Sequence, residues 1–463
     1  MNERELILEI LMEMEKNGTF SHIIIGQVLD KYNYLEPRQK AMIKRISEGT
    51  TERRLELDYI LNRYSKTPVS KMKPMIRQIL RMGVYQILYM DSVPDSAACN
   101  EAVKLARKHH FQNLSGFVNG VLRTVSRQKE NISYPDENQH PIEAVSIRTS
   151  MPVWILEMWQ EQYGKDRMIR MAEAQMQERP VGLRFRENLP PEKREQLIDE
   201  MTRQKVQIRS SKLLPFAYQA IHMEGMQNIE AFQQGFFTVQ DVSSMLPAEC
   251  AGIRAGDLIV DLCAAPGGKS MQAAELLSER EREAAQAGVT FAPGCVISRD
   301  LTQEKADRIR ENQERLGITC LKAEVFDALQ TDQELTGKAD VVFADLPCSG
   351  LGVIGRKTDI KYRMSEQQIE ELVSLQRRIL EASLGYLKPG GILMYSTCTV
   401  DRKENEEQVS WIQEHFPFQT EPLQGRIAEV LKQEENGSGM LQLFPGEHDT
   451  DGFFLARLRK RIG

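Results

Sequence analysis

The stretch Val260–Ser270, which reads V-D-L-C-A-A-P-G-G-K-S, constrains the fold of this chain more than any other. The apolar run Leu258–Leu262 ends in small residues and a Gly267–Gly268 pair, and a helical pattern follows at Ser270–Leu277. A strand of this composition is typically buried on both faces, as in a parallel sheet. Paired glycines let the backbone pass close to a ligand, and a helix N-terminus presents free N–H groups to it. The stretch therefore predicts a strand–turn–helix unit that binds a ligand.

Two common ligand-binding loops do not fit this stretch. A P-loop needs a glycine five residues before its last glycine, where this chain has Cys263, and Pro266 stiffens the turn. The dinucleotide fingerprint G-x-G-x-x-G is also absent. The run D-L-C-A-A-P-G-G-K instead resembles motif I of S-adenosylmethionine-dependent methyltransferases, in the form seen in RNA cytosine-C5 methyltransferases. This resemblance implies S-adenosylmethionine as the cofactor.

Residues 236–463 predict an α/β, Rossmann-like catalytic domain. Helical stretches lie between most of the strand candidates, which are Leu258–Leu262, Cys295–Ser298, Thr319–Ala323, Val341–Ala344, Gly391–Ser396 and Phe453–Leu458. This alternation predicts a mainly parallel sheet with helices on both faces. Ligands of such sheets bind outside the carboxyl ends of the strands. Asp300, Asp327 and Asp345 each follow a strand candidate, so we expect three carboxylates at that edge.

Two cysteines also follow strand candidates. Cys348 lies in Asp345–Gly350, D-L-P-C-S-G, and Cys398 lies in Tyr395–Thr399, Y-S-T-C-T. A free cysteine is usually a small buried hydrophobe, which is how we interpret Cys250, Cys295 and Cys320. That interpretation fits poorly for two cysteines in turns beside polar residues. We expect both to lie at the same edge of the sheet as the cofactor.

The family resemblance assigns roles to these residues. C5 of a pyrimidine is a weak nucleophile, and a thiolate that adds to C6 activates it. In RNA cytosine-C5 methyltransferases the cysteine of the Thr-Cys motif is this nucleophile, which implies Cys398 here. Cys348 of the Pro-Cys motif then assists product release, and Asp345 supplies a proton near N3. DNA cytosine-C5 methyltransferases use the Pro-Cys residue instead, so spacing alone does not decide which cysteine is the nucleophile.

The resemblance also implies a cofactor site, which consists of Cys263, Ala264, Ala265, Pro266, Gly267, Gly268, Lys269, Asp300, Asp327 and Asp345. Leu346 stands where the family often has alanine, and Leu301-Thr302 where a second acidic residue is common.

Residues 1–130 predict an all-helical, basic domain. The chain carries a net charge of −6, but residues 33–130 hold 18 Lys and Arg against 9 Asp and Glu. The runs Arg81–Leu88 and Gly116–Arg123 resemble the NusB-type RNA-binding domain. The resemblance implies RNA contact through a basic face, and a solvated helix surface is the alternative. The candidate residues for this contact are Arg38, Lys40, Lys44 and Arg45.

A polar linker at 128–141 precedes a small α+β domain at 142–235, which resembles the module before the catalytic domain in the same family. Its Arg184, Arg186 and Asn188 suit phosphate contact, although we prefer the solvent-facing side of a strand. After the Pro-Cys turn, Gly352–Tyr362 is a basic segment that either lines an RNA channel or forms an exposed loop. Its basic residues are Arg356, Lys357 and Lys361.

The fusion of the two resemblances points to the bacterial RsmB-type family, which acts on small-subunit (16S) ribosomal RNA. Two alternatives remain at this stage: a tRNA cytosine-C5 methyltransferase, and an RNA-binding assembly factor with an inert methyltransferase domain. The scattered cysteines and histidines predict neither disulfides nor a metal site. Without an 18-residue apolar run or an N-terminal signal, we expect no membrane contact. The cysteine usage fits a cytoplasmic protein, and we expect a monomer.

Overall fold

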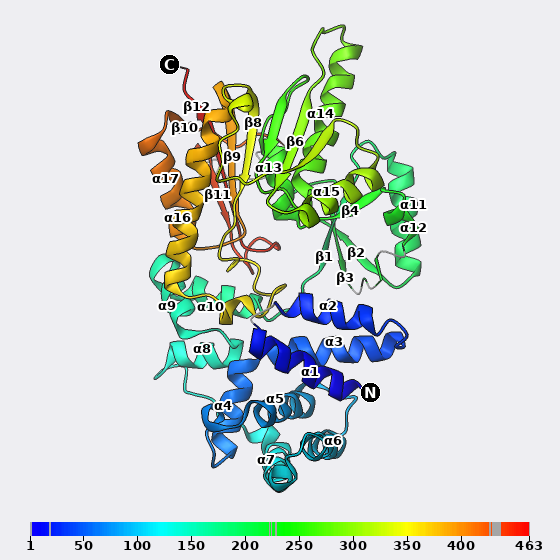
Figure 1. Cartoon of the computed structure of the whole chain (residues 1–463), viewed down its shortest axis with the longest axis vertical. Helices are drawn as coiled ribbons and strands as arrows, with labels where there is room; N and C mark the ends of the chain where they lie inside the picture. The colour runs from blue at the N-terminus through cyan, green and yellow to red at the C-terminus, as the bar shows by residue number, and fades with distance from the viewer. Residues whose placement is uncertain are drawn as a thin grey trace. The chain divides into compact units, whose positions relative to one another are not determined.

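The computed structural model describes residues 2–17, 20–221, 223, 225–226, 229–425, 427 and 437–462 (Figure 1). The chain divides into two compact units. The first comprises Met1–Gln177 and Ile354–Met364, and the second comprises Glu178–Val353 and Ser365–Gly463. This division is coarser than the three predicted domains, whose bounds stay a prediction. Within the described ranges, no helix combines the length and the apolar composition needed to cross a bilayer.

The first unit is helical. Its apolar residues recur at helical spacing, so each helix buries one face against its neighbours. The helices are α1 (Glu3–Asn17), α2 (Ser21–Lys31), α3 (Pro37–Glu52), α4 (Arg54–Tyr64), α5 (Pro74–Tyr89), α6 (Asp95–Lys108), α7 (Ser115–Gln128), α8 (Pro141–Thr149), α9 (Val153–Tyr163) and α10 (Lys165–Ala174).

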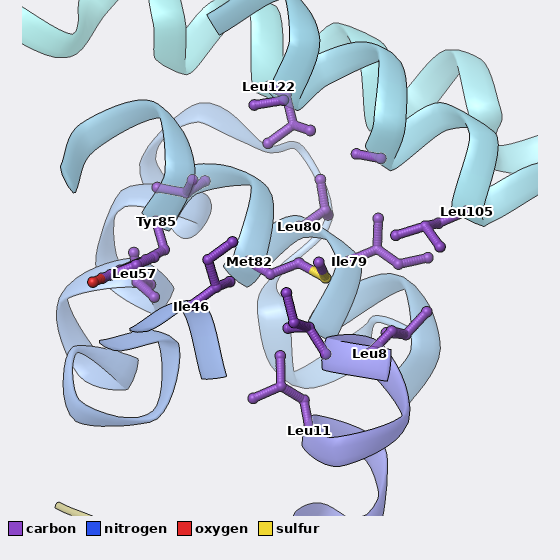
Figure 2. Close-up of a cluster of buried hydrophobic side chains, with 14 of the residues drawn as sticks. Leu8, Leu11, Ile46, Leu57, Ile79, Leu80, Met82, Tyr85, Leu105 and Leu122 are labelled. Carbon is purple, nitrogen blue, oxygen red and sulfur yellow. The ribbon is translucent and has the colours of Figure 1, made fainter. Parts of the chain in front are cut away.

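Helix α5 is the centre of this unit, with eleven of its residues buried. Figure 2 shows its side chains meeting those of α1, α3, α4, α6 and α7; the labelled residues are Leu8, Leu11, Ile46, Leu57, Ile79, Leu80, Met82, Tyr85, Leu105 and Leu122. A Cβ at Gly49 of α3 would lie 2.1 Å from the Tyr85 ring, so the close contact of α3 with α5 requires glycine there.

The segment Ile354–Met364 belongs to the helical unit, although it follows the Pro-Cys turn in the sequence. The Gly355 N–H donates to Gln175 Oε1 at 2.6 Å. The Tyr362 hydroxyl donates to the carbonyls of Glu52 at 2.9 Å and Ser150 at 3.1 Å. These contacts join the segment to α3, α8 and the end of α10.

The second unit contains two sheets. The smaller is antiparallel, in the order β2–β3–β1–β4. Its strands and helices are β1 (Val181–Phe185), α11 (Pro191–Arg203), β2 (Gln207–Ser210), β3 (Ala217–Ile221), α12 (Glu230–Gln233) and β4 (Phe237–Val239). The sequence predicts β1 and α11 at these same residues. The prediction that Arg184 faces solvent or phosphate is wrong: the side chain is buried, pairs with Glu275, and its Nε donates to Gln240 Oε1 at 2.9 Å.

The larger sheet runs β10–β12–β9–β8–β5–β6–β7, with β11 paired to β12. Neighbours from β9 to β7 are parallel, whereas β12 is antiparallel to β9, β10 and β11. The strands are β5 (Leu258–Asp261), β6 (Cys295–Asp300), β7 (Leu321–Val325), β8 (Ala339–Asp345), β9 (Leu387–Thr397), β10 (Phe418–Thr420), β11 (Met440–Leu443) and β12 (Phe453–Lys460). The predicted Rossmann-like architecture is confirmed.

Helices cover both faces of this sheet. Alternate strand residues contact α13 (Val242–Cys250), α14 (Gly268–Gln286) and α15 (Gln303–Leu316) on one face. The others contact α16 (Glu366–Ser383) and α17 (Glu406–His415) on the opposite face (Figure 1). The charged segment 279–290 mostly continues α14 as far as Gln286. The chain order reverses beside β5, since β6 follows it on one side and β8 lies on the other, and open α/β sheets bind ligands at such points.

Candidate active site

The motif I loop lies between β5 and α14, at the carboxyl end of the central strand. Gly267 has a φ of +100°, which favours glycine, and its N–H donates to the Ala264 carbonyl at 2.7 Å. Helix α14 begins at the next residue, so its first N–H groups have no intrahelical acceptor. Below the loop, Asp261 Oδ1 is buried and has no hydrogen-bond partner. The loop thus combines close backbone approach with unsatisfied polar groups, which fits a bound polar cofactor.

Asp300, the last residue of β6, lies against the same loop. Its carboxylate is buried and accepts hydrogen bonds from the Ala265 N–H at 2.9 Å and the Leu301 N–H at 2.8 Å. The Lys305 ammonium, half-exposed, is 2.8 Å from Oδ1. Asp327 lies two residues beyond β7 and accepts from the Leu329 N–H of its own turn at 3.0 Å. The structure therefore joins Asp300 directly to the motif I loop, whereas the hydrogen bond of the Asp327 carboxylate is local.

Asp345, the last residue of β8, is paired with the lysine of motif I. Lys269 Nζ is 2.6 Å from Asp345 Oδ2, and Ser396 Oγ donates to Oδ1 at 2.8 Å. Burial opposes the charge on Lys269, but Asp345 outweighs it and raises the pKa of the ammonium. The ammonium also interacts with Cys398, because charge on that sulfur further raises the pKa of Lys269. A positive charge therefore lies within range of the predicted nucleophile.

The two predicted cysteines face each other. Cys348 Sγ and Cys398 Sγ are 3.3 Å apart, and both residues are partly exposed. The Gly352 N–H donates to the Cys398 carbonyl at 3.0 Å, which ties the two turns together. The hydrogen bond with Cys398, followed by burial, raises the pKa of Cys348 well above its usual range. The raised pKa favours the protonated Cys348 thiol, and the two sulfurs lie within hydrogen-bond distance, where either can be the donor.

Sequence reasoning missed the residues that hold these turns. Glu404, fully buried, accepts from the Ser349 N–H at 2.9 Å, from the Ser349 hydroxyl, and from Gln376 Nε2 at 3.0 Å. Asn405 Nδ2 donates to the Thr399 carbonyl beside Cys398 at 3.2 Å. Glu404 thus fixes the Pro-Cys turn, and Asn405 fixes the Thr-Cys turn. Their sequence signal, Asp401–Asn405 just after the second cysteine, is a charged and polar stretch of mixed sign that is otherwise ordinary.

The buried Glu404 predicts a pH-dependent stability. Burial raises its pKa to about 7 from 4.5. Because the folded state keeps the proton between these values, the stabilisation is complete below pH 4.5 and is lost as pH rises through 7. Glu404→Gln cannot titrate. We therefore expect the unfolding free energy of the wild type, relative to this variant, to fall by on the order of 3 kcal/mol across that window. Denaturant unfolding at a series of pH values measures the difference.

Glu366→Gln is the matched control for this experiment, because Glu366 is an exposed residue of α16. Its difference from the wild type at each pH gives the effect of removing a glutamate charge at an exposed position. Asp257 and Asp261, whose pKa values burial also raises, titrate in all three proteins and cancel from the comparison. A wild-type minus Glu404→Gln difference that stays constant from pH 4.5 to 7.5 would show that Glu404 is ionised throughout.

Three of the four residues predicted to contact RNA through the helical unit are exposed, all on α3: Arg38, Lys44 and Arg45. Lys40 is half-buried, and its Nζ donates to the Asn33 carbonyl at 2.9 Å. The placement of Lys361 in an RNA channel is wrong, because the side chain is 1% exposed and its Nζ donates to the Thr149 carbonyl at 3.3 Å. Burial lowers the pKa of Lys361 to about 7.

In the part of the chain that the structure describes, no cluster of His, Cys, Asp and Glu is arranged to hold a metal.

Comparison with known proteins gives matches to both halves of the chain. Residues 251–459 match the family model described as "16S rRNA methyltransferase RsmB/F", and residues 1–127 match the "NusB family". A "Probable ribosomal RNA small subunit methyltransferase B" of Bacillus subtilis is 33% identical over 461 residues, covering 99% of this chain and 98% of the relative. The protein of the same name from Synechocystis is 30% identical, covering 99% and 100%.

Solved structures share the fold. The protein PH0851 superposes with a TM-score of 0.77 at 22% identity, covering 99% of each chain. NSun6 from Pyrococcus horikoshii, solved with SFG, gives a TM-score of 0.56 at 21% identity. That alignment covers 67% of this chain and 99% of the other. These likenesses support the multidomain architecture described above.

Proposed function

Because this chain belongs to the RsmB/F family of 16S rRNA methyltransferases, which are S-adenosylmethionine-dependent, we propose that it methylates C5 of a cytosine in small-subunit rRNA through a covalent adduct with Cys398. The observation that carries this proposal is the 3.3 Å approach of Cys348 and Cys398 beside the Lys269–Asp345 pair. One thiol alone is a common buried hydrophobe. Two partly exposed thiols next to a partly buried ion pair, at the ligand-binding edge of the sheet, form a nucleophilic site.

Motif I is the proposed cofactor site. The free N–H groups of α14, the buried carboxylates of Asp261 and Asp300, and Gly267 fit S-adenosylmethionine, whose adenosine and amino acid parts carry hydroxyl, ammonium and carboxylate groups. Cys263–Lys269, Asp300, Asp327 and Asp345 would hold it. When bound, the cofactor supplies an electrophilic methyl group on a sulfonium. The protein positions the base and controls its protons.

The proposed reaction begins with the Cys398 thiolate adding to C6 of the cytosine while N3 takes up a proton. That proton comes from the Lys269 ammonium, 2.6 Å from Asp345 Oδ2, and the Asp345 carboxylate passes it to N3. The electron pair at C5 would then bond to the methyl group of a bound cofactor as the methyl–sulfur bond breaks and leaves its electrons on the sulfur. N3 returns its proton, a base removes the C5 proton, and the C6–sulfur bond breaks to release 5-methylcytosine and the thiolate. The target base must leave its stack to reach Cys398, which favours a loop or an exposed nucleotide.

Cys348 has a different role in this proposal. Because its pKa is raised by the hydrogen bond with Cys398, its thiol remains protonated and donates to the neighbouring sulfur. A hydrogen bond of this kind stabilises sulfur as it leaves C6. Cys348 therefore assists product release and does not attack the base. The monomeric state, the cytoplasmic location and the lack of a metal requirement stay predictions from the sequence.

A substrate comparison tests the proposal. The purified protein, given S-adenosylmethionine, is incubated separately with unmodified 16S rRNA and unmodified tRNA, and bisulfite sequencing locates any 5-methylcytosine. We expect a single modified cytosine in 16S rRNA and none in tRNA. Modification of tRNA alone would support the tRNA alternative. A methyl group on another atom or another base would contradict the C5 assignment, and no transfer to any RNA would support the inert assembly factor.

A further inference from the structure

The helical unit holds a polar cavity of about 390 Å³, a size suited to a small ligand group. Its walls come from α1, α3, α4, α5 and the segment Ile354–Met364, all of which belong to this one unit. Two carboxylates line it, those of Glu15 and Asp359, against four guanidinium groups, those of Arg54, Arg77, Arg81 and Arg363. The cavity therefore carries an excess of positive charge.

Three of the four arginines have carboxylate partners. Arg81 forms a two-pronged pair with Asp58, at 2.7 Å and 2.6 Å, Arg77 pairs with Glu15, and Arg363 Nε is 2.9 Å from Asp359 Oδ2. Arg54 differs, because its guanidinium carbon lies 3.7 Å from the centre of the Tyr362 ring. Among the described residues, no carboxylate lies within ion-pair distance of Arg54. Its fork of N–H groups is thus held flat by the ring and is free to bind an anion.

Two further polar atoms on the cavity residues have no partner. Thr50 is 1% exposed, and its hydroxyl makes no hydrogen bond; the buried Arg77 Nε makes none either. Buried donors without acceptors are costly and rare in native proteins. A ligand with several oxygen acceptors and a negative charge would satisfy them together with Arg54. Among biological groups, phosphate meets this description best.

We propose that this cavity binds a backbone phosphate of the substrate RNA, with Arg54 as its main cation. The proposal rests on the RNA substrate proposed above, and RNA is the source of phosphate that such a protein meets at its working site. Phosphate contacts supply much of the affinity of proteins for nucleic acids. Tyr362 belongs to the segment that follows the Cys348 turn in the sequence. A phosphate bound to Arg54 therefore also stabilises the position of that segment on the helical unit.

The test compares Arg54→Gln with Arg63→Gln, a matched control on the exposed side of the same helix. The dissociation constant of unmodified 16S rRNA is measured by filter binding over a series of salt concentrations. We expect Arg54→Gln to weaken binding about tenfold and to lower the salt dependence by about one phosphate contact, while Arg63→Gln changes neither. Thr50→Val, which keeps the shape and removes the unpaired hydroxyl, should weaken binding in the same direction. The proposal is overturned if folded Arg54→Gln binds the RNA with the affinity and salt dependence of the wild type. If Arg54→Gln does not fold, wild-type affinity in Thr50→Val overturns it instead.

A second arm separates RNA from free anions. Thermal unfolding of the wild type and Arg54→Gln is followed with inorganic phosphate as the probe. If phosphate raises the melting temperature of the wild type alone while RNA affinity is equal in both proteins, the cavity is a site for a free anion and the RNA proposal fails. Failure of the proposed methylation is a separate result, because it appears as an absence of 5-methylcytosine with the wild-type enzyme and leaves the binding comparison intact.

Discussion

Cys398→Ala lowers methyl transfer to unmodified 16S rRNA by at least about 1,000-fold in the mechanism proposed here. Alanine cannot add to C6, and without that bond C5 stays too weak a nucleophile to accept the methyl group. Cys348 cannot replace it, because its raised pKa keeps it protonated at neutral pH. Incorporation of tritiated methyl groups from S-adenosylmethionine, measured under single-turnover conditions, gives the ratio of rates.

Cys295→Ala is the control for this experiment. Cys295 is a partly exposed cysteine at the first residue of β6, at the opposite end of that strand from Asp300. Its substitution should leave the rate within about twofold of the wild type. RNA affinity should be unchanged in both variants, which separates loss of chemistry from loss of binding. If Cys398→Ala kept the activity and Cys348→Ala lost it, the two cysteines would have the opposite roles.

Much of the fold could be predicted because local patterns and tertiary packing agree. Helix α15, one of the predicted helical stretches between strands, spans Gln303–Leu316, because Thr302 caps it and Gly317 ends it. The apolar runs of β5, β6, β8 and β9 lie in the buried parallel part of the sheet, where composition alone identifies strands. The short strands β10 and β11 had no such signal. They exist because β12 offers them backbone partners, which is a tertiary effect.

The candidate site, like the fold, has residues that a local sequence signal identifies and residues that only their tertiary partners identify. Motif I and the two cysteines are continuous sequence signals at strand ends, so their positions followed from the fold. The partners of these residues are distant in sequence: Lys269 meets Asp345, and Glu404 meets Ser349. Arg184 shows most clearly where prediction from the sequence pattern fails. Its alternation with apolar residues suggested a solvated strand face. In the interior, however, Glu275 of α14 neutralises its charge and Gln240 Oε1 accepts a hydrogen bond from it. Only a structure reveals such compensation, because the pattern of one strand does not encode what packs on it.

The other large effect expected is that Cys348→Ala accumulates a covalent protein–RNA adduct. Of the two cysteines, only Cys398 is needed for addition to C6, so the bond still forms and the methyl group is still transferred. Its breakage slows, because the departing sulfur loses the hydrogen bond that the Cys348 thiol gives it at 3.3 Å. We expect a shifted protein band on a denaturing gel after reaction with 16S rRNA and S-adenosylmethionine. It should represent at least about tenfold more adduct than the wild type gives.

The double variant Cys348→Ala/Cys398→Ala decides which sulfur holds the RNA. It should give no shifted band. Ribonuclease digestion of the adduct formed by Cys348→Ala should reduce the shift to that of the protein carrying a short oligonucleotide. Cys348→Ser offers a finer comparison, because a hydroxyl still donates a hydrogen bond but its oxygen is smaller and lies farther from Cys398. It should release product faster than alanine and more slowly than cysteine. A Cys348→Ala enzyme that turns over at the wild-type rate without adduct would show that the Cys348 hydrogen bond contributes nothing to release.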